Sequence, residues 1–280
     1  MADSGKTVKH FVVVRFFPYQ SIDYPYNVLN PDFLAKQAAL VKSNIIKSLE
    51  NQTNKNFELI FYVHSYLLSD KRYKPILATL KDSETWQIRF FKKGDIIPVF
   101  KEAFDNYDYV IHTRMDFDDF VYKDAVADTQ NKINECADIL SYGYCKGYRY
   151  RSLEENLYHY LYLSNGTGHP SVFQSLIMKS SFAKDLPFVS SYSFAHHKVK
   201  PKLKNFLEKN NIEFSENMFL QNVSDNAYIY FRHEFANEII AKKRKMTDNL
   251  KRSNSVLVED MTKEQLEEEF GFNYEVKSLK

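Results

Sequence analysis

The chain has 280 residues, of which 44% are hydrophobic and 26% are charged, so it can bury a large core and is not a disordered protein. Its formal net charge is only +2, which argues against a polyanion-binding surface, and we expect no nucleic-acid partner. The seven glycines form neither GxGxxG nor GxxxxGK[ST], which excludes the common glycine-rich phosphate loops.

Strand-like and helix-like segments alternate between residues 10 and 142. The predicted strands are short runs of β-branched and aromatic residues, and the predicted helices carry apolar residues at helical spacing. Strands are expected at 10–17, 57–64, 85–91, 108–116 and 138–144, and helices at 33–52 (with Asp32 as its cap), 69–82, 94–107 and 122–137. This order predicts an α/β fold with a mostly parallel sheet flanked by helices, and a ligand site outside the carboxyl ends of the strands.

The pattern loosens after Ser141. The tyrosine-rich stretch 142–170 predicts irregular strands and a loop, and further strands are expected at 172–179 and 226–235, with a helix at 200–210. A linker over 253–261 leads to a terminal helix, for which Thr262 and Gln265 form a possible capping box and Gly271 is the stop.

The stretch "VIHTRMDFDDF" brings three carboxylates to the end of the fourth predicted strand. In an extended segment Asp116 and Asp118 point the same way and Asp119 points the opposite way. Two converging carboxylates suit Mg²⁺ or Mn²⁺, with waters and diphosphate oxygens as further ligands. Such an ion neutralises the charge on a leaving diphosphate, as a nucleotide-sugar transferase requires. A plain turn, or a cap by Asp118 or Asp119 for the helix near Tyr122, is the alternative.

The two segments "SLENQTNKNFELIFYV" (48–63) and "HTRMDFDDF" (112–120) resemble blocks of the bacterial putative rhamnosyltransferase family of GT-A-type glycosyltransferases. That family has Ser-Leu-x-x-Gln-Thr-x-x-x-Phe before its second strand and Thr-Arg-(Leu/Met)-Asp-x-Asp-Asp at the end of a later one. The pieces "FQSLIM", "HHKV" and "YIYFRHEF" follow in the same order, so the resemblance covers about residues 11–235. The chain departs at Phe117, where the family often has a polar residue, and keeps both acidic positions.

The resemblance implies a GT-A-like fold and a metal-dependent glycosyltransferase of the hexosyltransferase class, acting in cell-surface polysaccharide synthesis. Such an enzyme moves a sugar, rhamnose among the candidates, from a nucleotide-diphosphate donor to a saccharide or lipid-linked glycan. Residues 1–240 would form the transferase domain, with a nucleotide-binding half at about 10–142 and an acceptor half at about 143–240. Residues 241–280 would form a charged helical extension.

The same resemblance guides the choice of site residues. Mn²⁺ or Mg²⁺ is expected on Asp116 and Asp118, and His233, which ends a predicted strand, suits Mn²⁺ as a third ligand. Arg15 and Arg114, with Asp116, are expected to meet the donor. For each arginine an internal ion pair is the alternative, and His233 could equally bond a backbone carbonyl.

Candidate acceptor residues lie in the second half of the chain. His196 and His197 in "SFAHHKVK" are candidates for binding phosphate or acceptor, and a solvated loop is the alternative. Gly168 and His169 lie in "SNGTGHP", where glycine permits unusual backbone angles, although a plain turn explains the loop equally well. Asp185 and Glu234 are candidate general bases for the acceptor hydroxyl, and no spacing argument selects between them.

Composition guides the expected cellular location of the protein. Cys136 and Cys145 are too few for a disulfide framework, and the chain shows neither a signal peptide nor a run approaching about 20 apolar residues. We therefore expect a cytoplasmic protein, whose basic residues between Lys242 and Arg252 either touch anionic lipid at the inner face of the membrane or form a solvated helix face. The alternative functions are a nucleotidyl or phosphoryl transferase that uses the same carboxylates, and an inactive carbohydrate-binding protein.

Overall fold

The computed structural model describes residues 5–16, 30–81, 88–92, 94–161, 167–169, 172–194, 196–232, 256–277 and 279. Within this part of the chain, nine strands form one sheet in the order β3-β2-β1-β4-β8-β6-β9-β5, and β7 pairs with β6 beside that path. The strands are β1 (Val8–Phe16), β2 (Glu58–Val63), β3 (Arg89–Phe91), β4 (Tyr109–Asp116), β5 (Phe120–Val121), β6 (Ile139–Arg151), β7 (Asn156–Leu161), β8 (Gln174–Lys179) and β9 (Phe219–Arg232).

The sheet is mixed. Strands β1, β2, β3 and β4 are parallel to one another, as the alternation predicts, and β9 is parallel to β6. The antiparallel pairs are β4 with β8, β8 with β6, β6 with β7, and β9 with β5. The parallel half therefore presents the carboxyl ends of β1 and β4 side by side.

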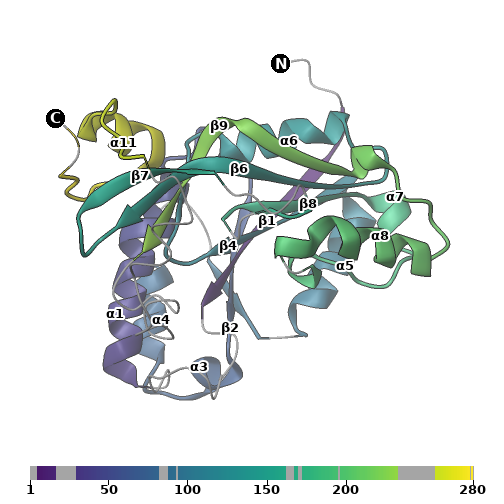
Figure 1. The fold of residues 1–280 in the computed structure, drawn as a ribbon. Coiled ribbons are helices and arrows are strands. Elements are labelled where there is room, and N and C mark those ends of the chain that lie inside the picture. The colour runs from purple at the N-terminus through teal and green to yellow at the C-terminus, as the bar shows by residue number, and fades with distance from the viewer. Residues whose placement is uncertain are drawn as a thin grey trace.

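Helices cover both faces of the sheet (Figure 1). The helical elements are α1 (Pro31–Val41), the π-helical turn η1 (Lys42–Ile46), α2 (Lys47–Glu50), α3 (Ser65–Ser69), α4 (Lys74–Lys81), α5 (Ile96–Asn106), α6 (Ala125–Asn131), α7 (Ser180–Ala183), α8 (Val199–Lys209) and α11 (Lys263–Phe270). Short 3₁₀ turns are η2 (Lys132–Asn134), η3 (Ser191–Ser193), η4 (His196–Lys198) and η5 (Glu216–Met218). In Figure 1, α1, α3 and α4 lie on one side of the sheet and α5, α7 and α8 on the other.

The apolar strands are explained by burial on both faces. In β1, Val12 and Val14 pack into a cluster with residues of α1, α2, α4 and α6, whereas Phe11 and Val13 pack into a second cluster with α5 and α8. A strand covered on both sides has no polar face, which is why residues 10–16 read as a nearly continuous apolar run.

Three local expectations about the first helices are corrected. The cap of α1 is Asn30, whose side chain accepts from the backbone N–H groups of Asp32 and Phe33, so Asp32 lies inside the helix. The predicted helix 33–52 is one run of α1, η1 and α2, with a π-helical turn in its middle. The predicted helix 69–82 is α4, which begins only at Lys74.

The tyrosine-rich stretch is more regular than predicted. Strands β6 and β7 pair in continuous antiparallel register from Lys146↔Leu161 to Arg151↔Asn156. The regularity follows from their alternation, since Tyr148, Tyr150 and Leu157 share one buried face while Arg149 and Tyr160 lie on the other.

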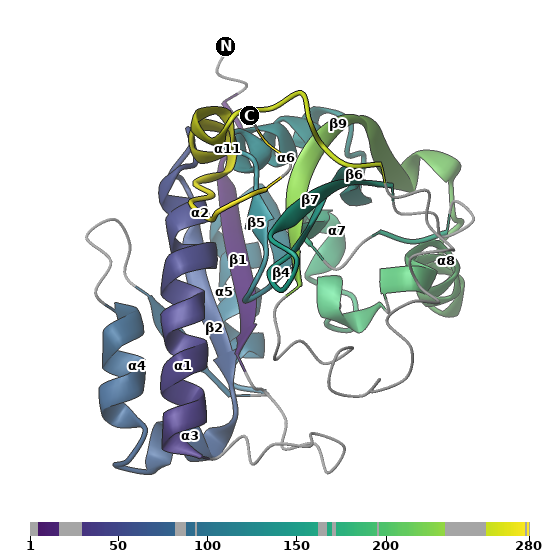
Figure 2. The same cartoon turned by 60° about the vertical axis from the view of Figure 1, so that its left-hand side comes forward.

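The C-terminal residues pack against this part of the sheet. Helix α11 has the predicted capping box, and Gly271 ends it with φ of 68°. Residues 256–258 do not form a free linker, because they run beside β7, where Val258 N–H donates to the Leu157 carbonyl at 3.0 Å. The buried residues of this segment are Val258, Leu266, Phe270, Phe272 and Val276, which form one cluster with Phe120, Tyr148, Tyr150, Leu157, Ile229 and Phe231. Figure 2 shows the segment in yellow at the end of the molecule where β6, β7 and β9 lie.

Among the residues that the structure describes, no helix is long and apolar enough to cross a bilayer. Both cysteines are buried and free of disulfide bonds. The basic stretch 242–252 and the domain boundary near 240 lie outside the described residues and remain predictions.

Candidate functional site

Two arginines and one aspartate converge where β1 and β4 end. The parallel register pairs Arg15 with Asp116, the last residue of β4. Arg114 shares the face of Asp116, because residues two apart on a strand point the same way. The Arg15 Nη2 lies 3.4 Å and the Arg114 Nη2 3.9 Å from the same Asp116 oxygen, Oδ1. Arg114 is 4% exposed, so its positive charge is fixed at the base of the site.

Tyr192, in η3, holds both guanidinium groups. Its ring centroid lies 5.2 Å from the Arg15 Cζ and 4.9 Å from the Arg114 Cζ, within cation–π range. Its hydroxyl donates to the carbonyl of Val13 at 2.8 Å and lies 3.4 Å from that of Met115. Burial raises the pKa of Tyr192, so the phenol keeps the proton that it donates. Sequence reasoning missed this residue, which lies in a non-periodic segment after β8.

A buried polar pair fixes the position of η3. His112 lies on the same face of β4 as Arg114, and its Nδ1 is 2.5 Å from the hydroxyl of Ser191, the neighbour of Tyr192. Burial lowers the pKa of His112 to about 3, so this imidazole is neutral at physiological pH. The pair therefore holds η3 in position without adding a charge to the site.

The predicted histidines 196 and 197 differ in their surroundings. Burial, aided by the charge of Arg114 and opposed by that of Asp116, lowers the pKa of His196 to about 4. His196 is therefore a neutral imidazole within electrostatic reach of the arginines and Asp116. His197 is exposed, and its ring lies edge-on to that of His196, with centroids 5.3 Å apart.

Gly168 and His169 support the segment that carries His196. A Cβ on Gly168 would lie 2.2 Å from the His196 carbonyl oxygen, so close approach, rather than an unusual backbone angle, explains this glycine. The His169 N–H donates to that same carbonyl at 2.8 Å. The His169 ring is fully buried and stacks on Phe219, with its Nε2 3.2 Å from the Ser141 hydroxyl. In this structure His169 is thus a buried support of the segment that carries His196, and the expectation that it meets an acceptor stays a prediction.

The acidic stretch is a turn and does not continue the strand. Strand β4 ends at Asp116, and the chain turns at Phe117 and Asp118, so the alternation argument for a same-side pair does not apply to Asp118. Phe117 packs edge-on against Phe16, with centroids 5.8 Å apart. Asp119 is fully buried, and its Oδ1 accepts the Phe231 backbone N–H at 3.0 Å. Asp119 therefore supports β9, and the expected helix cap is not formed by it.

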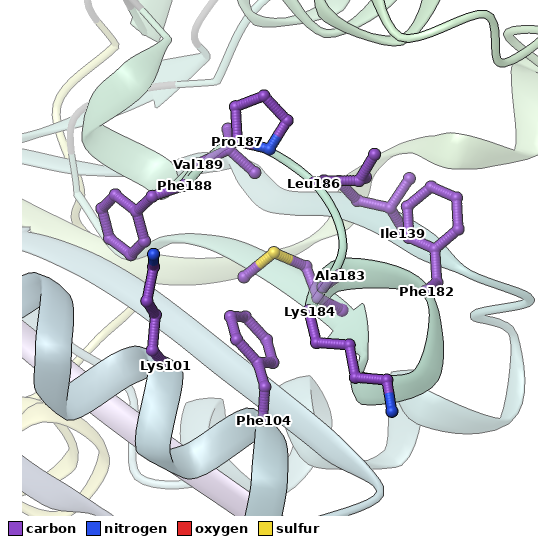
Figure 3. A pocket seen from close by; sticks show the side chains of 11 residues that line it. Lys101, Phe104, Ile139, Phe182, Ala183, Lys184, Leu186, Pro187, Phe188 and Val189 are labelled. Atoms are coloured by element: carbon purple, nitrogen blue, oxygen red, sulfur yellow. The ribbon is translucent and has the colours of Figure 1, made fainter.

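Asp185 lies at the other end of the sheet. It is an exposed residue of the turn after α7. Helix α7 begins directly after Lys179, and Lys179 pairs with Tyr109, the first residue of β4. A small apolar pocket at that end is lined by Phe104, Met178, Phe182 and Phe188, and by two lysines, Lys101 and Lys184 (Figure 3). The described residues of its lining include no carboxylate or imidazole. The structure thus does not bring Asp185 to Asp116.

Comparison with known families shows where the chain belongs. A family model described as "Putative rhamnosyl transferase" matches residues 26–228, more than half of the chain. The chain belongs to this rhamnosyl transferase family. Among curated proteins, none matches it.

Several solved structures are similar to this family member over most of its length. Residues 1–349 of Staphylococcus aureus TarS match with 14% identity and a TM-score of 0.39, over 83% of this chain and 63% of that one. The chain therefore spans less than two thirds of that TarS fragment. A "putative nucleotide-diphospho-sugar transferase" from Desulfovibrio desulfuricans G20 matches with 13% identity and a TM-score of 0.38, over 88% and 91% of the two chains.

In this rhamnosyl transferase family member, the "SLENQT" block holds the backbone that follows the acidic turn. The Ser48 hydroxyl bonds both the N–H and the carbonyl of Val121 at 2.9 Å. The Gln52 amide donates to the Tyr122 carbonyl at 2.8 Å and accepts from the Val126 N–H at 3.0 Å. The first block that carried the resemblance thus holds the residues that directly follow the second, and Ser48 and Gln52 are site supports that we assigned no role from sequence.

Asn44 holds the turn itself. Its side-chain amide donates to the Asp118 carbonyl at 2.8 Å, and its Oδ1 accepts from the Tyr274 hydroxyl at 2.6 Å. Asn44 lies in the π-helical turn, a feature often found near functional sites. The position of Asp118 therefore depends on both the first helical run and the C-terminal segment.

The structure describes only two of the three expected metal ligands. Asp116 and Asp118 offer carboxylate oxygens, the donor type that Mg²⁺ and Mn²⁺ prefer. Across the described ranges, no group of three or more His, Cys, Asp or Glu side chains could hold an ion by itself. His233 and Glu234 lie outside those ranges. A cation held by Asp116 and Asp118 would have to take its other ligands from water and a diphosphate, or from residues outside the described ranges.

Proposed function

We propose that this protein is a metal-dependent glycosyltransferase with a GT-A-like fold. It transfers a hexosyl group, with rhamnose among the candidates, from a nucleotide-diphosphate sugar to a saccharide or lipid-linked glycan. The observation that carries the proposal is the convergence of Arg15, Arg114 and Asp116 at the carboxyl ends of two adjacent parallel strands, where α/β sheets bind ligands. Membership of the rhamnosyl transferase family supports the same reading.

The two guanidinium groups have the geometry and charge to bind a diphosphate. Guanidinium forms paired hydrogen bonds with phosphate oxygens, and Tyr192 keeps both groups in place before the donor arrives. The negative charge of a diphosphate would raise the low pKa of His196, so this imidazole could then take up a proton and donate a further hydrogen bond.

Asp116 and Asp118 would hold the divalent cation, with His233 as the third protein ligand. When bound, Mg²⁺ or Mn²⁺ supplies charge neutralisation for the leaving diphosphate. Arg15 and Arg114, which share Asp116 Oδ1 in the structure, would move part of their contact to the donor oxygens. Glu234 remains a proposed general base, and the cytoplasmic location remains a proposal.

The test is turnover of UDP-, GDP-, CMP- and dTDP-sugars with Mn²⁺ and with a chelator. We expect hydrolysis or transfer of at least one donor that is lost with the chelator. Asp116→Asn and Asp118→Asn should each lower kcat/KM at least about 100-fold, because each removes a charge that must hold the cation, roughly 2.7 kcal/mol of transition-state stabilisation. Asp185→Asn is the matched control and should retain full activity, since this aspartate lies at the opposite end of the sheet.

Full metal-dependent activity in both the Asp116→Asn and Asp118→Asn variants would refute the site. A thermal shift with nucleoside triphosphates, and none with any nucleotide-sugar, would indicate a nucleotidyl or phosphoryl transferase instead. The absence of both nucleotide binding and turnover would indicate an inactive carbohydrate-binding protein.

A further inference from the structure

The extension of the sheet formed by β6, β7 and β9 has two different faces. The C-terminal segment covers the face that carries Tyr148, Tyr150 and Ile229. The opposite face carries residues that alternate with these along each strand: Arg149 and Arg151 on β6, Tyr158 and Tyr160 on β7, and Tyr228 and Tyr230 on β9. We call this second set the tyrosine–arginine face.

Arg149 lies against two tyrosines of this face. Its Cζ is 4.1 Å from the ring centroid of Tyr160 and 5.9 Å from that of Tyr230. The two rings are nearly parallel, with an interplanar angle of 19° and centroids 6.1 Å apart. All three side chains are half-buried, so each keeps part of its surface open to solvent. The result is an aromatic platform of two nearly parallel rings, with the guanidinium group over the Tyr160 ring.

The two arginines of the face differ in their charge partners. Arg151 pairs with Glu154 at 3.1 Å, and the Tyr158 hydroxyl donates to the same carboxylate at 2.7 Å. Within the described residues, Arg149 has no carboxylate at ion-pair distance, and its buried Nε has no hydrogen-bond partner. A partly desolvated cation that is held by rings and has no counter-charge among the described residues is suited to an anionic ligand.

The tyrosine–arginine face begins beside the acidic turn. Asp119, the last carboxylate of that turn, accepts the backbone N–H of Phe231, which follows Tyr230 on β9. Tyr230 is in turn the register partner of Arg149 on β6. A ligand on the platform would therefore lie next to the turn at which the donor is proposed to bind.

We propose that the tyrosine–arginine face is an acceptor subsite for a sugar residue that carries an anionic group. The carboxylate or phosphate would pair with Arg149, and the C–H face of the sugar ring would lie on Tyr160 and Tyr230, whose rings offer rigid apolar area. This inference rests on the proposed function, since it assigns the chemical class of the acceptor. It makes this transferase selective for acidic or phosphorylated glycans.

The test is binding of glucuronic acid, glucose 6-phosphate and glucose to the full chain, measured by saturation-transfer NMR and titration. We expect binding of at least one of the two charged sugars, and at least tenfold weaker binding of glucose. Which charged sugar binds distinguishes a uronic acid from a sugar phosphate. Arg149→Gln should weaken the charged sugar at least tenfold, and Arg149→Lys, which keeps the charge, should recover part of that loss. Arg72→Gln is the matched control and should change affinity less than twofold, because Arg72 lies outside this face and pairs with Asp70 at 2.7 Å.

Three results would overturn the subsite: no binding of either charged sugar, equal binding of glucose, or undiminished binding by Arg149→Gln with an unchanged melting curve. Titration of the nucleotide-sugar panel in parallel separates this inference from the proposed function. If charged sugars bind through Arg149 but no nucleotide-sugar binds, the subsite stands and the transferase proposal fails. If the nucleotide-sugar binds and the charged sugars do not, the subsite fails and the transferase proposal stands.

Discussion

At the scale of single residues, Tyr192 joins the parts of the candidate site. Two like-charged guanidinium groups face one carboxylate oxygen, and without a further constraint they would repel each other and spread apart. The ring of Tyr192 lies against both, while its hydroxyl is bonded to the backbone of β1 and lies near that of β4. The residue thus keeps two cations in position for an anionic ligand.

Replacing Tyr192 separates the effect of the ring from that of the hydroxyl. Tyr192→Ala should weaken nucleotide-sugar binding about tenfold, or ~1.4 kcal/mol, because both cation–π contacts are lost. Tyr192→Phe should bind the donor within about threefold of the wild type but lose ~1 kcal/mol of stability, because only the hydroxyl bonds are removed. Isothermal titration and urea unfolding measure the two effects. If the Phe variant lost as much affinity as the Ala variant, stacking would not be the cause.

At the scale of elements, the acidic turn is held by helices from both ends of the chain. The run of α1, η1 and α2 contributes Asn44, Ser48 and Gln52 to the backbone from Asp118 to Val126. Helix α11 contacts the same region from the other side, since the Lys123 ammonium pairs with Glu268 at 3.0 Å and with Glu269 at 2.9 Å. Loosening either element should therefore disturb the turn.

Gly271 offers a way to loosen α11 without touching the turn. Its φ of 68° is unfavourable for any residue with a Cβ, and an added Cβ would lie 3.1 Å from the Lys47 carbonyl oxygen. Gly271→Ala should lower the free energy of unfolding by ~1–2 kcal/mol, as measured in urea. Thr262→Ala, which removes the cap at the other end of the helix, should cost ~1 kcal/mol. An unchanged midpoint for Gly271→Ala would show that α11 contributes little to stability.

At the scale of the whole molecule, three buried histidines tie stability to pH. Burial lowers the pKa values of His10, His112 and His169 to about 3 each, so all three are neutral in the folded protein at pH 7. In the unfolded chain a histidine takes up a proton below about pH 6.5. Between about pH 6.5 and 3 the unfolded state therefore binds more protons, and stability must fall as the pH is lowered.

The expected slope is up to ~1.4 kcal/mol per pH unit for each histidine in the middle of that window. Urea unfolding at pH 7, 6 and 5 measures it, and His169→Gln should reduce the slope by one histidine's share. A pH-independent midpoint between 7 and 5 would contradict the buried neutral histidines.

The parts of the fold and site that could be predicted are those with a periodic signature. Strands covered on both faces read as apolar runs, and strand ends placed Arg15, Arg114 and Asp116 at one edge of the sheet. Tyr192 could not be found this way, because its role depends on how a non-periodic segment packs after β8. The same holds for the contact between Gly168 and His196, and for Asp118, where a turn replaces the strand geometry on which the alternation rule depends.

The position of the C-terminal segment has a consequence for biosynthesis. The acidic turn is translated long before Tyr274, whose hydroxyl orients Asn44, and before Glu268 and Glu269, which pair with Lys123. While the chain is still on the ribosome, β6, β7 and β9 would expose the apolar face that residues 256–277 later cover. The nascent protein should therefore pass through a stage with an exposed apolar face, which ends when residues 256–277 emerge and pack against the sheet.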